Sequence, residues 1–183
     1  MLIVLNGPPA AGKSTLARKY CADHPLALAL DIDGVRHLLG RWRDQPVEAG
    51  LAARAIAVAA ARVHLAAGYD VVVPQLVAHT VFLSELAAAA ADSGAQFLEF
   101  IVGVERDQSL QRYADRWLAG DDAVHGAADA PDLEDVGRSY GRLVAFAATR
   151  DVAVSLPVGS LNLIYQALLS VIQDLARYPI GDR

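Results

Sequence analysis

Lysine is almost missing from this chain. Of its 16 lysine and arginine residues in 183, only Lys13 and Lys19 are lysines, and arginine supplies the rest. A compact ammonium group fits inside a loop that wraps a phosphate, whereas the planar guanidinium of arginine is too large for that position. Because Lys13 lies in a glycine-rich segment, we interpret it as the lysine of a phosphate-wrapping loop.

Other scarcities exclude whole classes of protein. The single cysteine, Cys21, rules out an intrachain disulfide and suits a reducing cytoplasm. There is no uninterrupted apolar run of about 18 residues and no basic leader with a cleavable apolar segment, so we expect no membrane partner. The formal net charge of -5 argues against a nucleic-acid partner. We expect one cytoplasmic domain, whose oligomeric state the composition does not determine.

The most informative motif is G-P-P-A-A-G-K-S over residues 7–14, which follows the apolar run at residues 2–6 and precedes a helical pattern. Strand, tight glycine turn and helix N-terminus are the context of a phosphate-binding loop. Lys13 would reach the β- and γ-phosphates, and the Ser14 hydroxyl would hold Mg²⁺. The predicted nucleotide-binding residues are Gly7, Pro8, Pro9, Ala10, Ala11, Gly12, Lys13, Ser14 and Thr15.

Short apolar runs alternate with longer helical patterns, which predicts a parallel sheet with helices on both faces. We expect an α/β fold of three layers, with the sheet between two layers of helices. The expected strands are residues 2–6, 26–30, 69–73 (closed by Pro74), 95–103 and 152–155. The expected helices include residues 46–67, 79–92, 107–117 and 161–178.

Two carboxylates, Asp31 and Asp33, follow the second expected strand. Ligands of parallel sheets lie outside the carboxyl ends of the strands, so these residues and the phosphate loop should share one crevice. Asp33 would accept the proton of an acceptor hydroxyl, and Asp31 would reach the Mg²⁺ shell. The structural alternative is that Asp31 caps the next helix and Asp33 is a solvated charge in its first turn.

Several other residues are candidates for the acceptor site by position. Arg36 lies one helical turn beyond Asp33, and Trp42 offers a flat apolar face and an N–H donor. Gln75 and His79 follow the third expected strand, where no Walker B carboxylate is visible. A packed tryptophan in a surface basic patch, and a polar turn before a helix, are the structural alternatives.

Three stretches together resemble the small P-loop kinases of the nucleoside monophosphate kinase fold, such as shikimate, gluconate and chloramphenicol kinases. They are residues 2–15, residues 26–36 and residues 105–116. The resemblance implies an acceptor-binding aspartate, best matched by Asp33, and lid arginines that stabilise the transferring group, carried here by Arg112 and Arg116. Helix charges exposed to solvent are the alternative for these arginines.

The resemblance also implies the P-loop fold with strand order 2-3-1-4-5 and an adenine site, and the composition of one segment suggests a lid. The Gly- and Asp-rich segment at about 116–137 would close over the reaction, although an ordinary surface loop has the same composition. The turn after the last strand, with Pro157 and Gly159, would present backbone groups to the base. Arg150, just before that strand, could stack on it.

The sequence thus predicts a kinase that uses ATP and Mg²⁺ to phosphorylate a hydroxyl of a small molecule. Asp33, Lys13, Arg112 and Arg116 would be its catalytic residues. Antibiotic, sugar-like and metabolite acceptors remain open, as does a nucleoside or nucleotide acceptor. A nucleotide hydrolase or a nucleotide-regulated binding module is the alternative outside the kinases.

Overall fold

The apolar runs of the sequence form the strands of one parallel sheet. The computed structural model describes residues 1–119 and 132–177. Its strand order is β2-β3-β1-β4-β5, which confirms the predicted topology. The strands are β1 (Leu2–Asn6), β2 (Leu28–Ala29), β3 (Val71–Gln75), β4 (Phe97–Val102) and β5 (Val154–Leu156).

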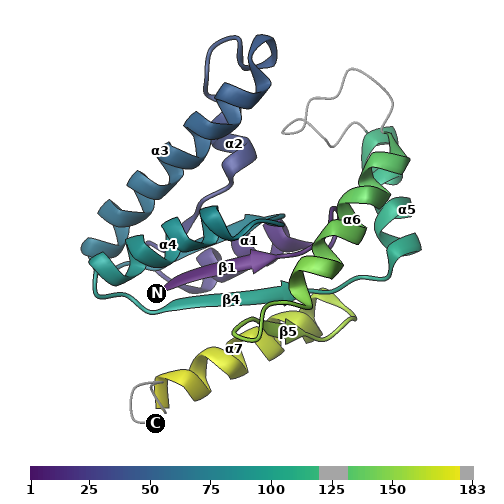
Figure 1. Cartoon of the computed structure of the whole chain (residues 1–183). Coiled ribbons are helices and arrows are strands. Elements are labelled where there is room, and N and C mark those ends of the chain that lie inside the picture. The colour runs from purple at the N-terminus through teal and green to yellow at the C-terminus, as the bar shows by residue number, and fades with distance from the viewer. Residues whose placement is uncertain (120–131, 178–183) are drawn as a thin grey trace.

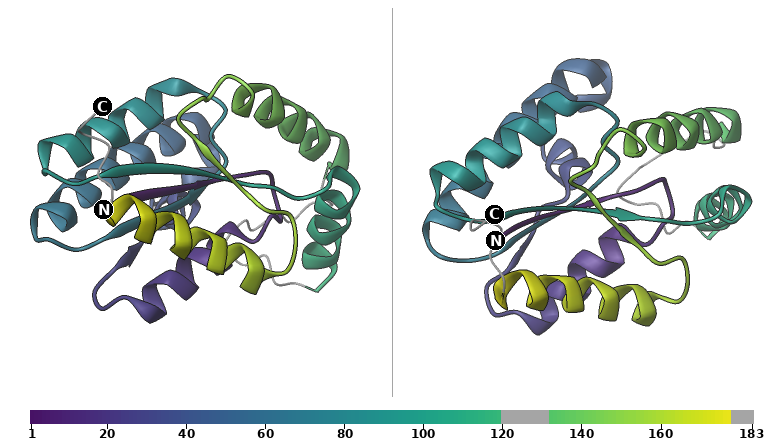
Figure 2. Two further views of the ribbon diagram at one scale, coloured as in Figure 1. Left: turned by 90° about the horizontal axis from the view of Figure 1, so that it is seen from below. Right: turned by 60° about the horizontal axis from the view of Figure 1, so that its bottom comes forward.

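Helices cover both faces of the sheet (Figures 1 and 2). Helices α1 (Lys13–Asp23) and α7 (Leu161–Arg177) pack on one face, against alternate residues such as Ile3, Leu5 and Phe100. The other face, with Leu2 and Val4, packs against a different group of helices. This group includes α2 (Ile32–His37), α3 (Pro46–Ala66) and α4 (Thr80–Asp92).

Two further helices stand at the end of the sheet where β4 stops (Figure 1). They are α5 (Arg106–Leu118) and α6 (Leu133–Ala147). Asp132 caps α6 by accepting hydrogen bonds from the backbone N–H groups of Glu134 and Asp135, at 2.9 and 3.1 Å. The predicted lid at about 116–137 therefore begins and ends in these two helices, and its residues 120–131 lie outside the described part of the chain.

Several predicted strand boundaries are wrong, and the fourth strand, for example, spans Phe97–Val102 rather than residues 95–103. Leu26 has a φ of 59°, a left-handed conformation that no strand residue adopts, so β2 begins at Leu28. The last strand begins at Val154 rather than Val152. The third strand continues through Pro74 to Gln75.

Pro74 is tolerated in β3 because of where its missing N–H would point. The Val72 carbonyl accepts from Leu30 N at 2.8 Å, so the even-numbered residues of β3 direct their polar groups toward β2. The pairing of β2 with β3 covers only Val71 and Val72. At the level of Pro74 this side of β3 therefore needs no ladder hydrogen bond.

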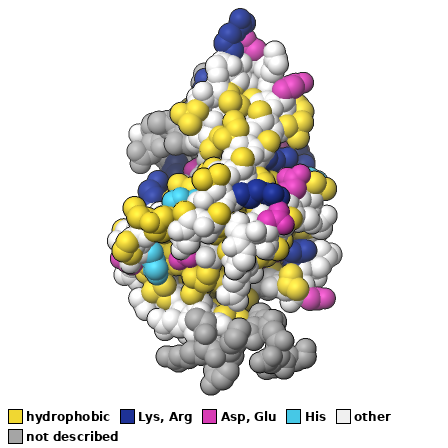
Figure 3. All heavy atoms as spheres, turned by 90° about the vertical axis from the view of Figure 1, so that its left-hand side faces the viewer, with side chains coloured by type: hydrophobic (Ala, Val, Ile, Leu, Met, Phe, Trp, Pro, Cys, Tyr) yellow, Lys and Arg dark blue, Asp and Glu magenta, His cyan; other side chains and the backbone are white. Residues whose placement is uncertain are grey.

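Helix α3 buries one alanine stripe, Ala49, Ala53, Ala57, Ala61 and Leu65, against the sheet side of the fold. Its outer side carries exposed apolar residues such as Leu51 and Val63. By length and composition alone α3 is apolar enough to cross a membrane, a test that core helices of soluble proteins also pass. Viewed from this side, apolar and charged side chains are interspersed over the surface (Figure 3).

Candidate active site

The phosphate loop occupies the turn between β1 and α1, as predicted. Ala10 and Gly12 have φ angles of 57° and 85°, both left-handed, and such residues are typical of loops whose backbone N–H groups form an anion-binding hollow. At Gly7 an added Cβ would lie 2.7 Å from the carbonyl oxygen of Val102, so only glycine fits beside β4. The loop therefore has the backbone shape that binds an anion.

Lys13 folds back over this loop. Its Nζ donates a hydrogen bond of 2.7 Å to the Pro8 carbonyl. Desolvation and the positive charge of Arg116 together lower the pKa of Lys13 to about 8, although Asp33 and Asp31 act in the opposite direction. These three charges come from different parts of the sequence, so the fold brings Asp31, Asp33 and Arg116 into the surroundings of Lys13.

The two carboxylates after β2 differ in their contacts. Asp31 caps α2, because one of its oxygens accepts from the N–H groups of Asp33 and Gly34 at 3.0 and 3.4 Å. Asp33 lies in the first turn of α2, and its carboxylate is 2.9 Å from Nη2 of Arg36. The capping role that the sequence left open for Asp31 is thus present, and Asp33 is held by a guanidinium rather than only by solvent.

Arg36 and Trp42 lie in one cluster. The guanidinium carbons of Arg36 and Arg43 are 4.8 and 4.5 Å from the centre of a Trp42 ring, and the His37 ring is 4.7 Å away. Trp42 also lines a hollow of about 520 Å³ with residues from the start of α3, including Glu48. Arg36 therefore connects the Asp33 carboxylate to this aromatic group.

Gln75 and His79, at the end of β3 and before α4, line one end of a groove between α3 and α4. This groove has a volume of about 570 Å³. Apolar side chains from both helices form most of it, among them Leu51, Val58 and Phe82. Besides Gln75 and His79, the polar residues of the lining are Arg54, Arg62 and Glu85, and the Arg54 guanidinium lies over the Phe82 ring at 5.8 Å.

A buried polar chain that sequence reasoning missed runs beneath this region. The amide of Asn6, immediately before Gly7, donates to the Val77 carbonyl and accepts from Val77 N, both at 2.9 Å. Asn6 Nδ2 also lies 3.3 Å from Glu99 in β4. Two features of the sequence could have indicated this chain: Asn6 ends a buried apolar strand, and Glu99 is a carboxylate inside another apolar strand.

Arg150 completes this chain. Its Nε and Nη2 donate to the same oxygen of Glu99 at 3.1 and 2.8 Å. The Glu99 side chain is only 1% exposed, so the pair lies at the edge of the core. Stacking of Arg150 on adenine stays a prediction that would require this guanidinium to serve two partners.

The turn after β5, which contains Pro157 and Gly159, lies close to the phosphate loop. A Cβ added at Gly12 would be 3.7 Å from Leu161, the first residue of α7. A Cβ added at Gly103, just after β4, would be 3.1 Å from Val158. Pro157 and Gly159 are exposed, so their backbone is accessible from solvent beside the loop.

The two predicted arginines of α5 are placed differently. Arg116 is partly buried, and its Nε has no hydrogen-bond partner among the described residues. Arg112 is exposed and is not among the charges that shift the pKa of Lys13. A further residue of α5, which sequence reasoning missed, is Ser109, whose hydroxyl donates to the Pro9 carbonyl at 2.7 Å.

Comparison with known families gives a match over most of these elements. A family model described as an AAA domain matches residues 2–133, which is well over half of the chain. The chain belongs to the AAA domain family. Within the AAA domain match lie the phosphate loop, the Asp31–Asp33 segment, Gln75, His79 and helix α5. No curated protein is significantly similar to this sequence.

Solved structures share the fold at low sequence identity. A gluconokinase from Sinorhizobium meliloti 1021 is 13% identical with a TM-score of 0.61, covering 97% of this chain and 96% of that one. The APS kinase CysC of Mycobacterium tuberculosis is 16% identical with a TM-score of 0.55, covering 94% and 96%. A chain of the Pnkp1/Rnl/Hen1 RNA repair complex is 13% identical with a TM-score of 0.65, covering 82% of this chain and 46% of that one. The protein therefore has the fold of P-loop kinases.

Proposed function

We propose that the protein is an ATP-dependent kinase that transfers the γ-phosphoryl group to a hydroxyl of a small molecule. The observation that carries this proposal is the surroundings of Lys13, which hold Arg116 together with Asp31 and Asp33. Phosphoryl transfer requires positive charge on the moving group and a carboxylate that accepts the proton of the attacking hydroxyl. Asp33, which follows β2, supplies such a carboxylate in this proposal.

In this reaction the acceptor oxygen forms a bond to the γ-phosphorus, the bond from that phosphorus to the ADP oxygen breaks, and the hydroxyl proton passes to Asp33. Lys13 and Arg116, with Arg112 from the same helix, would neutralise the charge on the transferred group. The backbone of residues 7–15 would hold the phosphates, and the turn with Pro157 and Gly159 would contact the base.

The donor atoms fit a magnesium ion. Ser14, at the start of α1, offers a hydroxyl, and Asp31 offers a carboxylate, which are the oxygen ligands that Mg²⁺ takes alongside phosphates and water. Bound there, the ion would neutralise phosphate charge. One Asp31 oxygen already accepts from two N–H groups of α2, so its orientation is fixed before any ion binds.

The groove between α3 and α4 supports an acceptor with an apolar body. Its volume of about 570 Å³ is within the range of small-molecule sites, and Gln75 and His79 stand at the end nearest β1. Arg36 and Trp42 would contact the part of the acceptor near Asp33. A purely polar sugar acid would leave most of the groove's apolar lining in contact with water.

The test is a screen for ATP-dependent phosphorylation, in which mass spectrometry detects the phosphorylated product. The panel contains hydroxyl-bearing antibiotics, sugar acids, nucleosides, apolar alcohols and an RNA oligonucleotide with a 5′-hydroxyl. We expect a product from a small molecule with an apolar body. Brisk hydrolysis of ATP with Mg²⁺ alone, with no acceptor raising the rate, would instead identify a hydrolase.

A further inference from the structure

Ser109 is a buried polar residue whose side chain joins helix α5 to the phosphate loop. It is 0% exposed, and its hydroxyl donates a hydrogen bond of 2.7 Å to the carbonyl of Pro9, a hundred residues earlier in the chain. A serine inside a helix usually turns its hydroxyl to the carbonyl four residues earlier. Here the hydroxyl reaches out of the helix instead, and the carbonyl of Glu105 receives the backbone N–H of Ser109 at 2.8 Å.

The face of α5 that carries Ser109 also carries the predicted catalytic arginines. Arg112 and Arg116 follow Ser109 by three and seven residues, a spacing that places all three along one side of a helix. Arg116 is close enough to Lys13 to act on its charge, and its buried Nε has no acceptor among the described residues. The anchored face of α5 is therefore the one that faces the phosphate site.

Other contacts of α5 attach it to α6 rather than to the loop. Nη2 of Arg106 in α5 lies only 2.8 Å from the position that a Cβ on Gly137 would take, so the two helices are in close contact there. Tyr140 of α6 donates to the Val104 carbonyl at 3.0 Å, just before α5 begins. These contacts involve α6 and the segment before α5, and neither of them reaches Pro9.

We propose that Ser109 is a positioning residue for phosphoryl transfer. Its hydrogen bond to Pro9 fixes α5 against the phosphate loop, so that Arg116 is aimed at the transferred phosphoryl group. This inference rests on the proposed function, because it assigns to Arg116 the task of stabilising that group. Ser109 itself touches neither ATP nor the acceptor.

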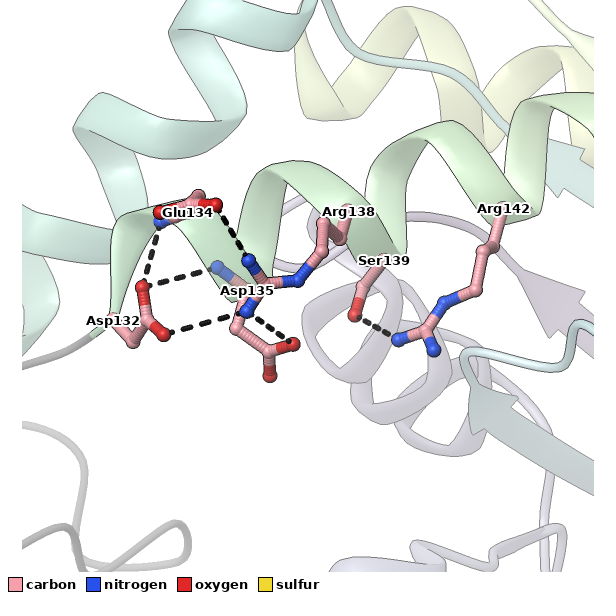
Figure 4. A network of polar contacts seen from close by, with 6 residues as sticks. All are labelled: Asp132, Glu134, Asp135, Arg138, Ser139 and Arg142. Atoms are coloured by element: carbon pink, nitrogen blue, oxygen red, sulfur yellow. Dashed lines mark hydrogen bonds and ion pairs between the residues drawn. The ribbon is translucent and has the colours of Figure 1, made fainter.

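The test compares Ser109→Ala with Ser139→Ala. Ser139 lies on α6, where its hydroxyl accepts a hydrogen bond of 3.0 Å from Arg142 at the surface (Figure 4). Both changes replace a helical serine by alanine, so their effects on helix propensity are alike. Release of ADP in the presence of Mg²⁺ and the acceptor found in the screen gives kcat and the KM for ATP, and titration calorimetry gives the Kd values of ADP and of a non-hydrolysable ATP analogue.

We expect Ser109→Ala to lower kcat about tenfold, the size of one hydrogen bond. Its affinity for the ATP analogue should fall relative to its affinity for ADP, because Arg116 addresses only the γ-phosphate. Ser139→Ala should match the unmodified protein in all of these. Ser109→Cys, which keeps a similar volume with a weaker donor, should have a kcat between those of Ser109→Ala and the unmodified protein.

A double-mutant cycle shows whether Ser109 acts through Arg116. If it does, Ser109→Ala should have little further effect on kcat in a protein that already carries Arg116→Ala. Full additivity of the two changes, or equal behaviour of Ser109→Ala and Ser139→Ala, would overturn the proposal. A protein without ATP turnover whose Ser109→Ala variant still loses preference for the ATP analogue would contradict the proposed function and leave the positioning role standing.

Discussion

Arg36 holds the carboxylate of Asp33, with 2.9 Å between its Nη2 and the nearer carboxylate oxygen. The same guanidinium lies over Trp42, and its Nε is buried without a partner among the described residues. Through Nη2, Arg36 orients the Asp33 carboxylate beside the Trp42 ring. The pair thus connects the proposed base with the aromatic cluster around Trp42.

Asp33→Asn tests the base directly. The amide keeps the shape of the carboxylate but cannot accept a proton, so we expect phosphoryl transfer to fall by about 10²–10⁴-fold. The Kd for ATP should change little, because the phosphate loop is intact. Asp44→Asn is the matched control, since Asp44 forms an exposed ion pair with Arg41. Full turnover in Asp33→Asn would exclude Asp33 as the base.

Arg116→Ala and Arg112→Ala should differ in their effects on kcat. Arg116 acts on Lys13 and is partly buried, whereas Arg112 is exposed. Loss of a guanidinium that stabilises the transferred group lowers kcat about 10³-fold or more. We expect that loss for Arg116→Ala and a smaller one for Arg112→Ala, measured as initial rates at saturating ATP. A larger loss for Arg112→Ala would mean that Arg112, and not Arg116, reaches the transferred group.

The titration of Lys13 can be observed directly because the chain has only two lysines. After reductive methylation with ¹³C-formaldehyde, the lysine NMR signals come from Lys13 and Lys19 alone. In the absence of nucleotide and Mg²⁺, the pKa of Lys13 should be about 8. Because Arg116 contributes to this lowering, Arg116→Ala should move the Lys13 midpoint to higher pH, with the Lys19 signal as the internal reference. An unchanged midpoint would mean that Arg116 lies too far from Lys13 to affect its pKa.

The same lowered pKa predicts how stability depends on pH. Between about 8 and the ordinary value of 10.5, the unfolded chain holds a proton on Lys13 that the folded chain has lost. The free energy of unfolding contributed by this group therefore rises with pH across that window, and below it the buried charge destabilises the fold. Lys13→Met should thus raise the thermal midpoint at pH 7 while abolishing turnover. Its advantage over the unmodified protein should shrink as the pH passes 8.

Arg150→Ala should destabilise the protein strongly. It would leave the Glu99 carboxylate, 1% exposed, without its guanidinium partner, and unpairing a buried charge costs about 3–5 kcal/mol. Denaturant unfolding measures this loss, and Arg150→Ala with Glu99→Leu should recover part of it. The Kd for ATP of the folded variant then decides whether Arg150 also stacks on the base. A large loss of ATP affinity at unchanged stability would favour stacking over the structural role.

Ala55→Trp should block the groove between α3 and α4. Ala55 lines this groove, so an indole there would occupy space needed by the apolar body of the acceptor. We expect the KM for the acceptor found in the screen to rise at least about tenfold, the effect of losing a few buried methylene groups. Ala66→Trp, at the exposed end of the same helix, is the control. Equal KM values in the two variants would place the acceptor elsewhere.

Much of this fold was predictable because its signals are local. The glycine loop after residues 2–6 determines a strand, a turn and a helix from neighbouring residues, and the alternation of patterns determines a parallel sheet. The errors occurred where tertiary contacts override local preference. Pro74 predicts the end of a strand, but β3 continues through it because β2 is too short to pair there. Leu26 belongs to an apolar run that predicts a strand, but its φ is left-handed.

By itself, then, the sequence determined the phosphate loop, the order of elements and the candidate carboxylates, since each depends on residues adjacent in the chain. Only the tertiary structure decided which side chains share a site. Ser109 meets Pro9 across a hundred residues, and Asn6 meets Glu99 and Val77 across three strands. Such hydrogen bonds form because a buried polar group must find a partner in space, and no spacing along the chain records which partner that is.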